Sequence, residues 1–445
     1  MPIQTLRVSW TRVAAAALLL CVGLAPAAAG AKGFRVNTPD DSVDVAPGDG
    51  RCEDALGRCS LRAAVQEANA RGRASIRLDR DLRYTLSLAG TGEDSAASGD
   101  LDVTGRIRLR GRGATLDAAG LDRIFDVQVG GELRIKRLEL TGGVAPEGEH
   151  GGALRNAGLV DAKRTVFAVN SAPGTAGAGG AIHNDGGALR VLRSTLRSNL
   201  AAAAGGAIAA DGGLTVVDRS VLRENDSGQD GGALHVVGSG ELWVGSSDLD
   251  GNTAARRGGA VWTGDQSDLY VFFTLFQENQ AEGDAPEDGG GALYNEADSF
   301  VFDSSLIDNL ASGAEGAGGA VLQAAGELSL EDSLVEQNQA GAGGGGVDVA
   351  GGFAFVGWSA LFENLAASDG GGLRVGPDAE GRVFRVAVVA NDADGSGGGL
   401  WCSATGTLNV DRSDIEDNDA PAGPDVFNEP PGGDFSIDDT PVPPG

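Results

Sequence analysis

The chain has 445 residues, 73 of them glycine, and a formal net charge of −29 at pH 7. Nucleic-acid binders need a basic footprint, so this charge argues against nucleic acid as a partner. It also disfavours anionic lipid surfaces, and it favours solubility or association with cations. Glycine weakens helix interiors, so its abundance argues against a protein built from helices.

Residues 1–31 have the features of a secretory signal peptide. Arg7 and Arg12 precede a short apolar run at 14–24, and small residues at 27–31 offer a cleavage site. The run is too short for a membrane span, and no later stretch is apolar enough to cross a bilayer. We therefore expect an exported protein, in the medium or at the cell surface, with no transmembrane segment in the mature chain.

Residues 32–72 are predicted to form an N-terminal cap. Cys52 and Cys59 flank one short loop of an exported chain, which favours a disulfide between them. A metal pair is the alternative, but it lacks other ligands. A short helix is expected after Ser60, its N-cap. The apolar stripe of this helix consists of Leu61, Ala64, Val65 and Ala68.

Few residues suggest a metal or another cofactor. The acidic segment before the cysteine loop could hold Ca²⁺, because hard cations bind several oxygens; a solvated acidic loop is the alternative. Its members are Asp40, Asp41, Asp44 and Asp49. The three histidines are too scattered for a metal site, so none is assigned. Cys402 falls on the inward side of its strand and is expected to be a small buried hydrophobe; a reactive thiol is the alternative.

From about residue 150 the chain repeats every 26 to 30 residues. Each repeat contains Gly-Gly, then Ala or Gly, then an aliphatic residue. Further on, an apolar residue is followed three positions later by asparagine. The asparagines are Asn170, Asn199, Asn225, Asn252, Asn279, Asn309, Asn338, Asn364, Asn391 and Asn418. Ser or Thr lies five residues before nine of these ten asparagines. A fixed period of this size indicates units that bury their apolar faces against their neighbours.

The units are predicted to be strands. Apolar residues between the Gly pair and the asparagine alternate with period two, as at Leu189 and Val191. Each unit then forms one rung of a parallel β-helix, with rungs about 4.8 Å apart. Looser strands extend this β-helix to residues 73–420. Residues 421–445, rich in Pro, Gly and Asp, are predicted to be a disordered tail.

The asparagine ladder has a structural interpretation. Stacked on identical side chains, each amide can donate to one neighbour and accept from the next. Asparagine also tolerates the left-handed conformation of sharp bends, so we expect it to occupy the bends. The ladder then builds the fold and carries no chemistry.

Two motifs carry a resemblance to known families. Gly-Gly-Ala-Ile/Leu/Val paired with Phe-x-x-Asn resembles the repeat of polymorphic outer-membrane proteins, which are right-handed parallel β-helices of the pectin-lyase-like type. Cys59-Ser-Leu-Arg-Ala-Ala resembles the Cys-Ser-Leu-Arg-Glu-Ala signature of secreted bacterial β-helix proteins, with Ala63 in place of Glu. These resemblances imply an all-β, right-handed parallel β-helix whose first rung is covered by a capping helix.

One outward row is the candidate binding site. The residue after the aliphatic of each Gly-Gly motif points outward, and this row contains Trp262, Tyr294 and Trp401. Trp262 and Tyr294 are expected on adjacent rungs. Exposed aromatic rings could stack on sugar rings or anchor a protein partner. The alternative is ordinary wall residues covered by neighbouring loops.

The same row argues against a catalytic site. Related pectin-lyase-like enzymes cut polysaccharides with clustered outward carboxylates, or with Ca²⁺-binding Asp and an Arg base. The row holds only Asp348, beside Arg374 on the next rung, which we interpret as an ion pair. A hydrolase needs two facing carboxylates, so no catalytic residue is assigned. We expect a monomeric, non-enzymatic, adhesin-like protein that binds a glycan or a protein. A polysaccharide lyase or glycoside hydrolase and a purely structural surface component are the alternatives.

Overall fold

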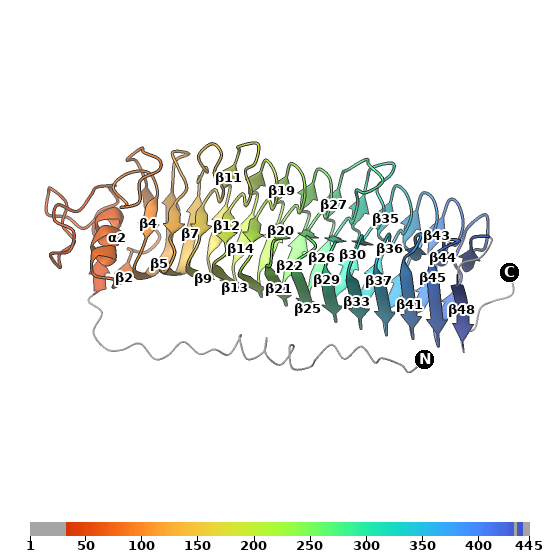
Figure 1. Ribbon diagram of the computed structural model, residues 1–445. Helices are drawn as coiled ribbons and strands as arrows, with labels where there is room; N and C mark the ends of the chain where they lie inside the picture. Colours follow the sequence, from red (N-terminus) through yellow and green to blue (C-terminus); the bar gives the residue numbers. More distant parts are fainter. Residues whose placement is uncertain (1–32, 431–433, 439–445) are drawn as a thin grey trace.

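The computed structural model describes residues 33–430 and 434–438, so the predicted signal peptide lies outside the described residues. The chain winds into a rod of stacked rungs, with one helix, α2 (Leu61–Ala70), at its N-terminal end (Figure 1). Neighbouring rungs pair through parallel strands. The predicted all-β parallel β-helix is therefore confirmed. Within the described part of the chain, no helix is long and apolar enough to span a membrane.

Each regular rung contributes strands to three sheets. One rung contains β16 (Ile208–Asp211), β17 (Leu214–Asp218), β18 (Val221–Arg223) and β19 (Asp226–Ser227). β16 belongs to a 13-stranded sheet and β19 to a nine-stranded sheet. β17 and β18 belong to a 26-stranded sheet, which we call the large sheet. The strands that stack on β17 are its first column, and those that stack on β18 are its second column.

The strand bounds follow this order along the rod. The first column contains β1 (Gly33–Arg35), β2 (Arg73–Arg77), β5 (Arg106–Asp117), β7 (Glu132–Thr141), β9 (Leu159–Lys163), β13 (Ala188–Leu192), β17, β21 (Glu241–Gly245), β25 (Asp268–Phe272), β29 (Asp298–Phe302), β33 (Glu327–Glu331), β37 (Phe353–Gly357), β41 (Glu380–Phe384), β45 (Thr407–Asp411) and β48 (Asp434–Asp438). The second column contains β3 (Arg83–Thr85), the ends of β5 and β7, β10 (Val166–Ala168), β14 (Thr195–Arg197), β18, β22 (Asp248–Asp250), β26 (Leu275–Gln277), β30 (Ser305–Ile307), β34 (Leu334–Glu336), β38 (Ala360–Phe362), β42 (Ala387–Val389) and β46 (Asp414–Glu416). The 13-stranded sheet contains β4 (Leu101–Val103), β6 (Phe125–Val127), β8 (Leu154–Asn156), β12 (Ile182–Asp185), β16, β20 (Leu234–Val237), β24 (Val261–Thr263), β28 (Leu293–Asn295), β32 (Val321–Gln323), β36 (Val347–Val349), β40 (Leu373–Val375), β44 (Leu400–Cys402) and β47 (Val426–Asn428). The nine-stranded sheet contains β11 (Ser171–Ala172), β15 (Leu200–Ala201), β19, β23 (Thr253–Ala254), β27 (Gln280–Ala281), β31 (Leu310–Ala311), β35 (Gln339–Ala340), β39 (Leu365–Ala366) and β43 (Asp392–Ala393).

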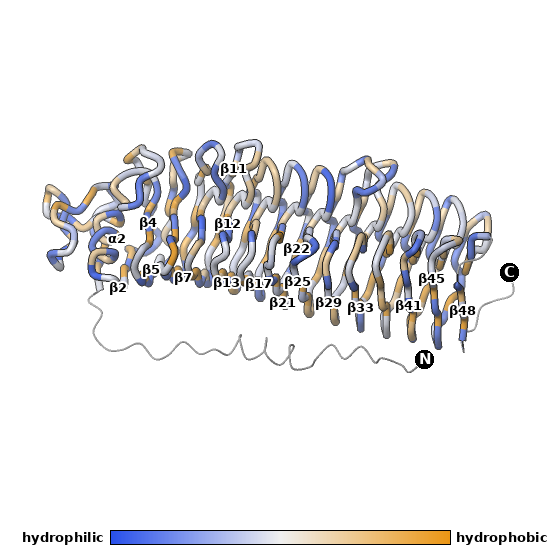
Figure 2. Tube along the Cα trace, viewed as in Figure 1, coloured by the Kyte–Doolittle hydropathy of each residue, from blue (hydrophilic) through white to orange (hydrophobic). Residues whose placement is uncertain are grey.

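The core is a single column of apolar side chains inside the rungs. In the five-residue strands of the first column the second and fourth residues point inward, as Leu189 and Val191 do, while the first, third and fifth point outward. Hydrophobic and hydrophilic residues alternate along the rungs accordingly (Figure 2). One continuous cluster of buried residues runs from Val36 to Ile415. Cys402 belongs to it, as predicted.

The asparagine ladder is complete. The Oδ1 of each asparagine accepts from the Nδ2 of the asparagine one rung earlier, at 2.8 to 3.0 Å, over all nine steps from Asn170 to Asn418. The same Oδ1 accepts from the backbone N–H of the preceding asparagine, as between Asn252 and Asn279 at 3.1 Å. At the end of the ladder, Asp425 accepts from Asn418 at 3.0 Å. The predicted donor and acceptor pattern is confirmed.

The predicted conformation of the asparagines is wrong. The left-handed residue at each bend is the one before the asparagine, such as Ser198 at φ +52° and Glu278 at φ +53°. The asparagine side chain stacks inside the bend. The left-handed conformation is therefore adopted by the preceding residue, whose side chain can point towards solvent. A second bend, between the two columns of the large sheet, is also left-handed, for example at Arg193 with φ +50°. The Ser/Thr row stacks beside it, where Ser220 Oγ accepts from Ser194 N at 3.1 Å.

The N-terminal cap has the predicted disulfide and helix. Cys52 and Cys59 are bonded. Ser60 Oγ accepts from the backbone N–H of Ala63 at 3.0 Å and caps α2. One boundary differs from the prediction, because β1 precedes the helix and pairs with β2 in the large sheet. The solenoid therefore begins inside the segment predicted as the cap, ahead of its disulfide and helix.

The C-terminal end also differs from the prediction. Within the segment expected to be disordered, β47 pairs with β44 and β48 pairs with β45. These strands add a further rung although the Gly-Gly and asparagine motifs have ended. Phe435 and Ile437 keep the period-two pattern and pack against the core. The prediction of disorder relied on the Pro, Gly and Asp content of the whole segment, which obscures this short alternation.

Candidate functional site

The outward row proposed from the sequence lies on the 13-stranded sheet and is covered. Trp262 and Tyr294 are on adjacent rungs, as expected. Their exposed fractions are only 7% and 3%, and that of Trp401 is 8%. Trp262, Tyr294, Ala317 and Leu322 form a small second core outside the sheet. The row therefore offers little exposed ring surface, and the alternative of wall residues covered by loops is the observed arrangement.

The covering groups over this row are charged. The Arg257 guanidinium lies 5.5 Å from the ring centre of Trp262 and 5.1 Å from that of Tyr294. Arg257 is in turn paired with Asp230 at 2.9 Å. Further along, Asp348 and Arg374 form the predicted ion pair, at 2.8 Å. Sequence periodicity could not predict that these side chains cover the aromatic rings, because the loops between rungs vary in length and sequence.

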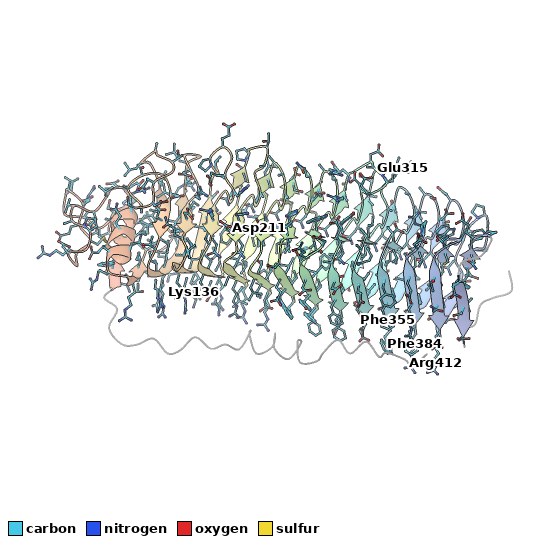
Figure 3. All side chains as sticks on the ribbon, in the orientation of Figure 1. Lys136, Asp211, Glu315, Phe355, Phe384 and Arg412 are labelled. Atoms are coloured by element: carbon cyan, nitrogen blue, oxygen red, sulfur yellow. A yellow bond between two sulfur atoms is a disulfide. The ribbon has the colours of Figure 1, made fainter. Side chains whose placement is uncertain are left out.

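Aromatic side chains gather elsewhere, on the outer face of the large sheet, where most are half-buried, Tyr270 is buried, and Phe273 and Trp358 are exposed. They occupy outward positions of first-column strands and the bends that follow them. We call this set the aromatic face: Trp243, Tyr270, Phe272, Phe273, Phe300, Phe302, Phe355, Trp358 and Phe384. Figure 3 shows Phe355 and Phe384 projecting from the lower edge of the rod. The chain has 22 aromatic residues, so this one face holds a large share of them.

The rings of the aromatic face have two orientations. Trp243 and Tyr270 are stacked rung on rung, with centroids 4.0 Å apart and planes 14° apart. Such stacking stabilises neighbouring strands and presents ring edges outward. Phe273 and Trp358 lie across these stacks. The Phe273 ring is at 87° to Phe302. The Trp358 ring is at 70° to Phe355 and 77° to Phe384.

Phe273 and Trp358 are the most exposed rings of this face. Their exposed fractions are 57% and 45%. Both sit at left-handed bends, with φ +52° and +50°. The left-handed conformation costs an L-residue about 1–2 kcal/mol, and bulky residues rarely adopt it. Neither the bend nor the core therefore accounts for an aromatic residue at these two positions.

The sequence contained the signal for part of this face. Trp243 lies between Leu242 and Val244, which the alternation places inward, so Trp243 must point outward. Tyr270 follows from the same rule. Phe273 and Trp358 follow no alternation, because they lie at bends. Only the structure shows that these residues share one surface.

Buried carboxyl groups form a second cluster, on the first rungs of the 13-stranded sheet. Asp102 and Asp126 are paired neighbours on β4 and β6. Burial raises the pKa of Asp102 to about 6 and that of Asp100 to about 8. Arg123 lies 2.9 Å from Asp100. The cluster is not apparent from the sequence, because the rungs before residue 150 keep a looser period that does not align their outward positions with those of the later rungs.

The carboxyl cluster predicts a pH dependence of stability. An aspartate has a pKa of about 3.9 in an unfolded chain, so the folded chain binds these protons more tightly. The stabilisation of the folded chain by protonated Asp102 is complete below pH 4. It is lost as the pH rises through about 6, the pKa of Asp102 in the folded chain. We expect the N-terminal rungs to be less stable at pH 8 than at pH 5, by at least about 1 kcal/mol.

Hydrogen exchange of β4 and β6 at the two pH values measures this effect. Asp102→Asn should reduce the difference, whereas Glu147→Gln, a change at an exposed carboxylate, should leave it intact. An undiminished pH dependence in the Asp102→Asn protein would contradict the assignment.

The residues considered for metal binding do not converge. Among the described residues, no group of three or more His, Cys, Asp or Glu side chains is placed to hold a metal ion. In the acidic segment of the cap, Asp40 pairs with Arg58, and Asp41 pairs with Arg62. Asp44 accepts from the backbone of Ala46 at 2.9 Å. Each of these aspartates therefore has its own partner within the cap, and their carboxylates do not converge on one point.

Comparisons with known proteins are sparse. No family model matches the chain. D-alanine–D-alanine ligase from Anaplasma centrale is 35% identical over 94 residues, which are 21% of this chain and 45% of the ligase. The chain therefore spans less than half the length of this curated relative, and the match does not assign a family.

Two solved structures resemble the chain in its backbone. Tailspike protein 3 of bacteriophage CBA120 has 12% identity and a TM-score of 0.43, covering 89% of this chain and 61% of the tailspike. The A-module of mannuronan C-5 epimerase AlgE4 from Azotobacter vinelandii has 13% identity and a TM-score of 0.27, covering 88% of this chain and 98% of the module. Similarity at this level assigns neither a fold nor an activity, and the parallel β-solenoid rests on the strand pairing of this chain alone.

Proposed function

We propose that the protein is a non-enzymatic, adhesin-like binding protein whose aromatic face holds an extended glycan chain. One observation carries this proposal: Phe273 and Trp358 expose ring surface at bends where the backbone disfavours a bulky residue. Ring faces stack on the apolar faces of sugar rings. Aromatic side chains also supply much contact area while losing little conformational entropy.

The periodicity of the surface favours a polymer. Outward positions repeat at every rung, about 4.8 Å apart along the rod. Such a surface is matched by a linear chain of repeating units. Polar groups border the rings on the same strands, since Glu241 and Asp298 occupy the first outward positions of β21 and β29. Carboxylates beside aromatic rings can accept hydrogen bonds from sugar hydroxyls, whereas a purely apolar protein partner would leave them unpaired.

A polysaccharide lyase or hydrolase is the second candidate. The observation that favours it is the raised pKa of Asp100 and Asp102, since a general acid needs a carboxyl group that keeps its proton near neutral pH. Both side chains are buried, however, and Asp102 accepts from the backbone of Ala96 at 2.7 Å. This arrangement fits an internal structural cluster better than a cleft open to a polymer.

Export to the medium or the cell surface belongs to the same proposal. The disulfide between Cys52 and Cys59 supports it, because disulfides persist in oxidising compartments. A monomer with the ligand lying along its rod suffices for the binding described.

Removing the exposed rings should weaken binding. We would measure retention of the purified protein on neutral and acidic polysaccharides, together with the release of new reducing ends. The Phe273→Asn/Trp358→Asn protein should bind at least about tenfold more weakly, a loss of about 1.4 kcal/mol. Asparagine tolerates the left-handed conformation, so the bends themselves should be preserved.

Val169→Asn is the matched control. Val169 is also exposed and left-handed, at φ +57°, but it lies at the other bend of its rung. Its replacement should not affect retention. Equal retention of the double variant and the wild type would refute the proposal, as would failure of every polymer to bind. New reducing ends would establish the enzymatic alternative.

A further inference from the structure

Cations line two neighbouring rows on the N-terminal half of the large sheet. In the last outward position of the first column, Arg110 pairs with Lys136 and Lys136 pairs with Lys163. The left-handed bends beside this row carry arginine on successive rungs. We call these seven residues the basic face: Arg110, Lys136, Lys163, Arg137, Arg164, Arg193 and Arg219.

Most of these cations have no anionic partner among the described residues. For six of the seven, no carboxylate oxygen of those residues lies within 4.0 Å. The exception is Arg219, whose Nη1 is 4.0 Å from Asp218. Lys163 is half-buried and the other six are exposed. Their charge is therefore available to a ligand.

The fold gives no reason for this arrangement. Like charges directly opposite each other on neighbouring strands are destabilising. Left-handed bends favour glycine or asparagine, yet four successive bends carry arginine. The protein as a whole has 34 lysine and arginine residues against 63 acidic ones. Gathering seven of these cations in one strip costs stability, so the strip requires a functional explanation.

The basic face and the aromatic face occupy the same two rows of the large sheet. The row of Arg110, Lys136 and Lys163 reaches Phe272 and Phe302 after three intervening rungs, which carry Leu192, Asp218 and Gly245. In Figure 3, Lys136 projects from the same lower edge of the rod as Phe355 and Phe384. The bend row likewise leads from its four arginines through Ser246 to Phe273, and Asp303 and Asp332 occupy the next two bends.

We propose that the basic face binds the anionic groups of an acidic glycan, whose chain bears carboxylate or sulfate groups and continues onto the aromatic face. This inference rests on the proposed function for the identity of the polymer. Guanidinium groups bind such oxyanions through paired hydrogen bonds, which suits a strip in which five of the seven cations are arginine.

The width of the strip favours a single polymer chain. The basic face is two rows wide. On β7 the next outward position on one side holds Arg134, whose charge is paired with Glu132 at 2.5 Å, and Glu139 lies on the other side. A DNA duplex or a lipid bilayer would extend beyond these borders onto a protein surface that is acidic overall. A single polysaccharide chain can lie within the strip.

The test combines charge removal with ligands of defined charge. The variant Lys136→Gln/Arg164→Asn/Arg193→Asn removes three charges with residues that the bends tolerate. Polygalacturonate supplies carboxylates, heparin supplies sulfates, and galactomannan is the neutral polymer. We expect the variant to bind the two acidic polymers at least about tenfold more weakly at low salt, with a shallower salt dependence. Galactomannan binding should not change, and Arg51→Gln, at an exposed cap residue, should behave as wild type.

The outcomes separate the two proposals. Unchanged binding of both acidic polymers by the folded triple variant would overturn this inference and leave the proposed function standing. Loss of acidic-polymer binding in the triple variant, with no effect of Phe273→Asn/Trp358→Asn on any polymer, would support the basic face and refute the aromatic one. Binding of duplex DNA or phosphatidylserine vesicles, without binding of polygalacturonate or heparin, would also overturn the inference.

Discussion

Replacing Asn279 with alanine is expected to lower the free energy of unfolding by about 3–5 kcal/mol. Asn279 lies in the middle of the ladder and is fully buried. Its Oδ1 accepts from the backbone N–H of Asn252 at 3.1 Å and from Asn252 Nδ2 at 2.9 Å. Its Nδ2 donates to the Leu249 carbonyl at 2.8 Å. Alanine leaves these groups buried without partners, and each unsatisfied group costs about 1–3 kcal/mol.

Chemical denaturation and hydrogen exchange would measure this loss. Each rung contacts only its neighbours, so exchange should accelerate most in β22 to β30 and least at the ends of the rod. Gln277→Ala is the control in the same rung, because Gln277 is only half-buried and its Nε2 has one contact, with Glu278 at 3.4 Å. A change below 1 kcal/mol in Asn279→Ala would mean that water or local relaxation replaces the ladder bonds.

Replacing Arg62 with methionine is expected to detach the cap from the first rung, at a cost of about 3–5 kcal/mol. The Arg62 side chain is fully buried and pairs with Asp41 at 2.7 Å. It also donates to the carbonyls of Asp100 and Gly99, at 3.0 and 2.7 Å. Methionine fills a similar volume but leaves a buried carboxylate and these carbonyls unpaired.

Limited proteolysis and hydrogen exchange at residues 86–100 would report this detachment. Arg62→Met/Asp41→Leu should recover part of the loss, because it removes the stranded carboxylate together with its partner. Arg51→Gln, at an exposed position of the cap, should have no measurable effect. Wild-type protection of residues 86–100 in the Arg62→Met protein would show that the disulfide and α2 hold the cap without this ion pair.

The sequence determined the fold because the repeats are local and redundant. The Gly-Gly and asparagine positions recur in ten units, and the alternation within each unit assigns inward and outward side chains without long-range information. The disulfide was predictable from one short loop. The limits of the solenoid were not, because β1 and β48 lie outside the repeats and are recruited by pairing with an exposed strand edge.

The candidate site depended on tertiary structure. Sequence periodicity places Trp262 and Trp243 outward alike, but loops cover the first and leave the second half-exposed. Which outward row is exposed to solvent depends on how loops of unequal length fold across neighbouring rungs. The sequence of a single repeat does not contain this information. Net charge was equally uninformative about local charge, because stacking brings cations some 27 residues apart in sequence into one strip, as Arg137 and Arg164 show. The sequence by itself determined the rungs, the core and the ladder; only stacking in three dimensions decided which side chains share an exposed surface.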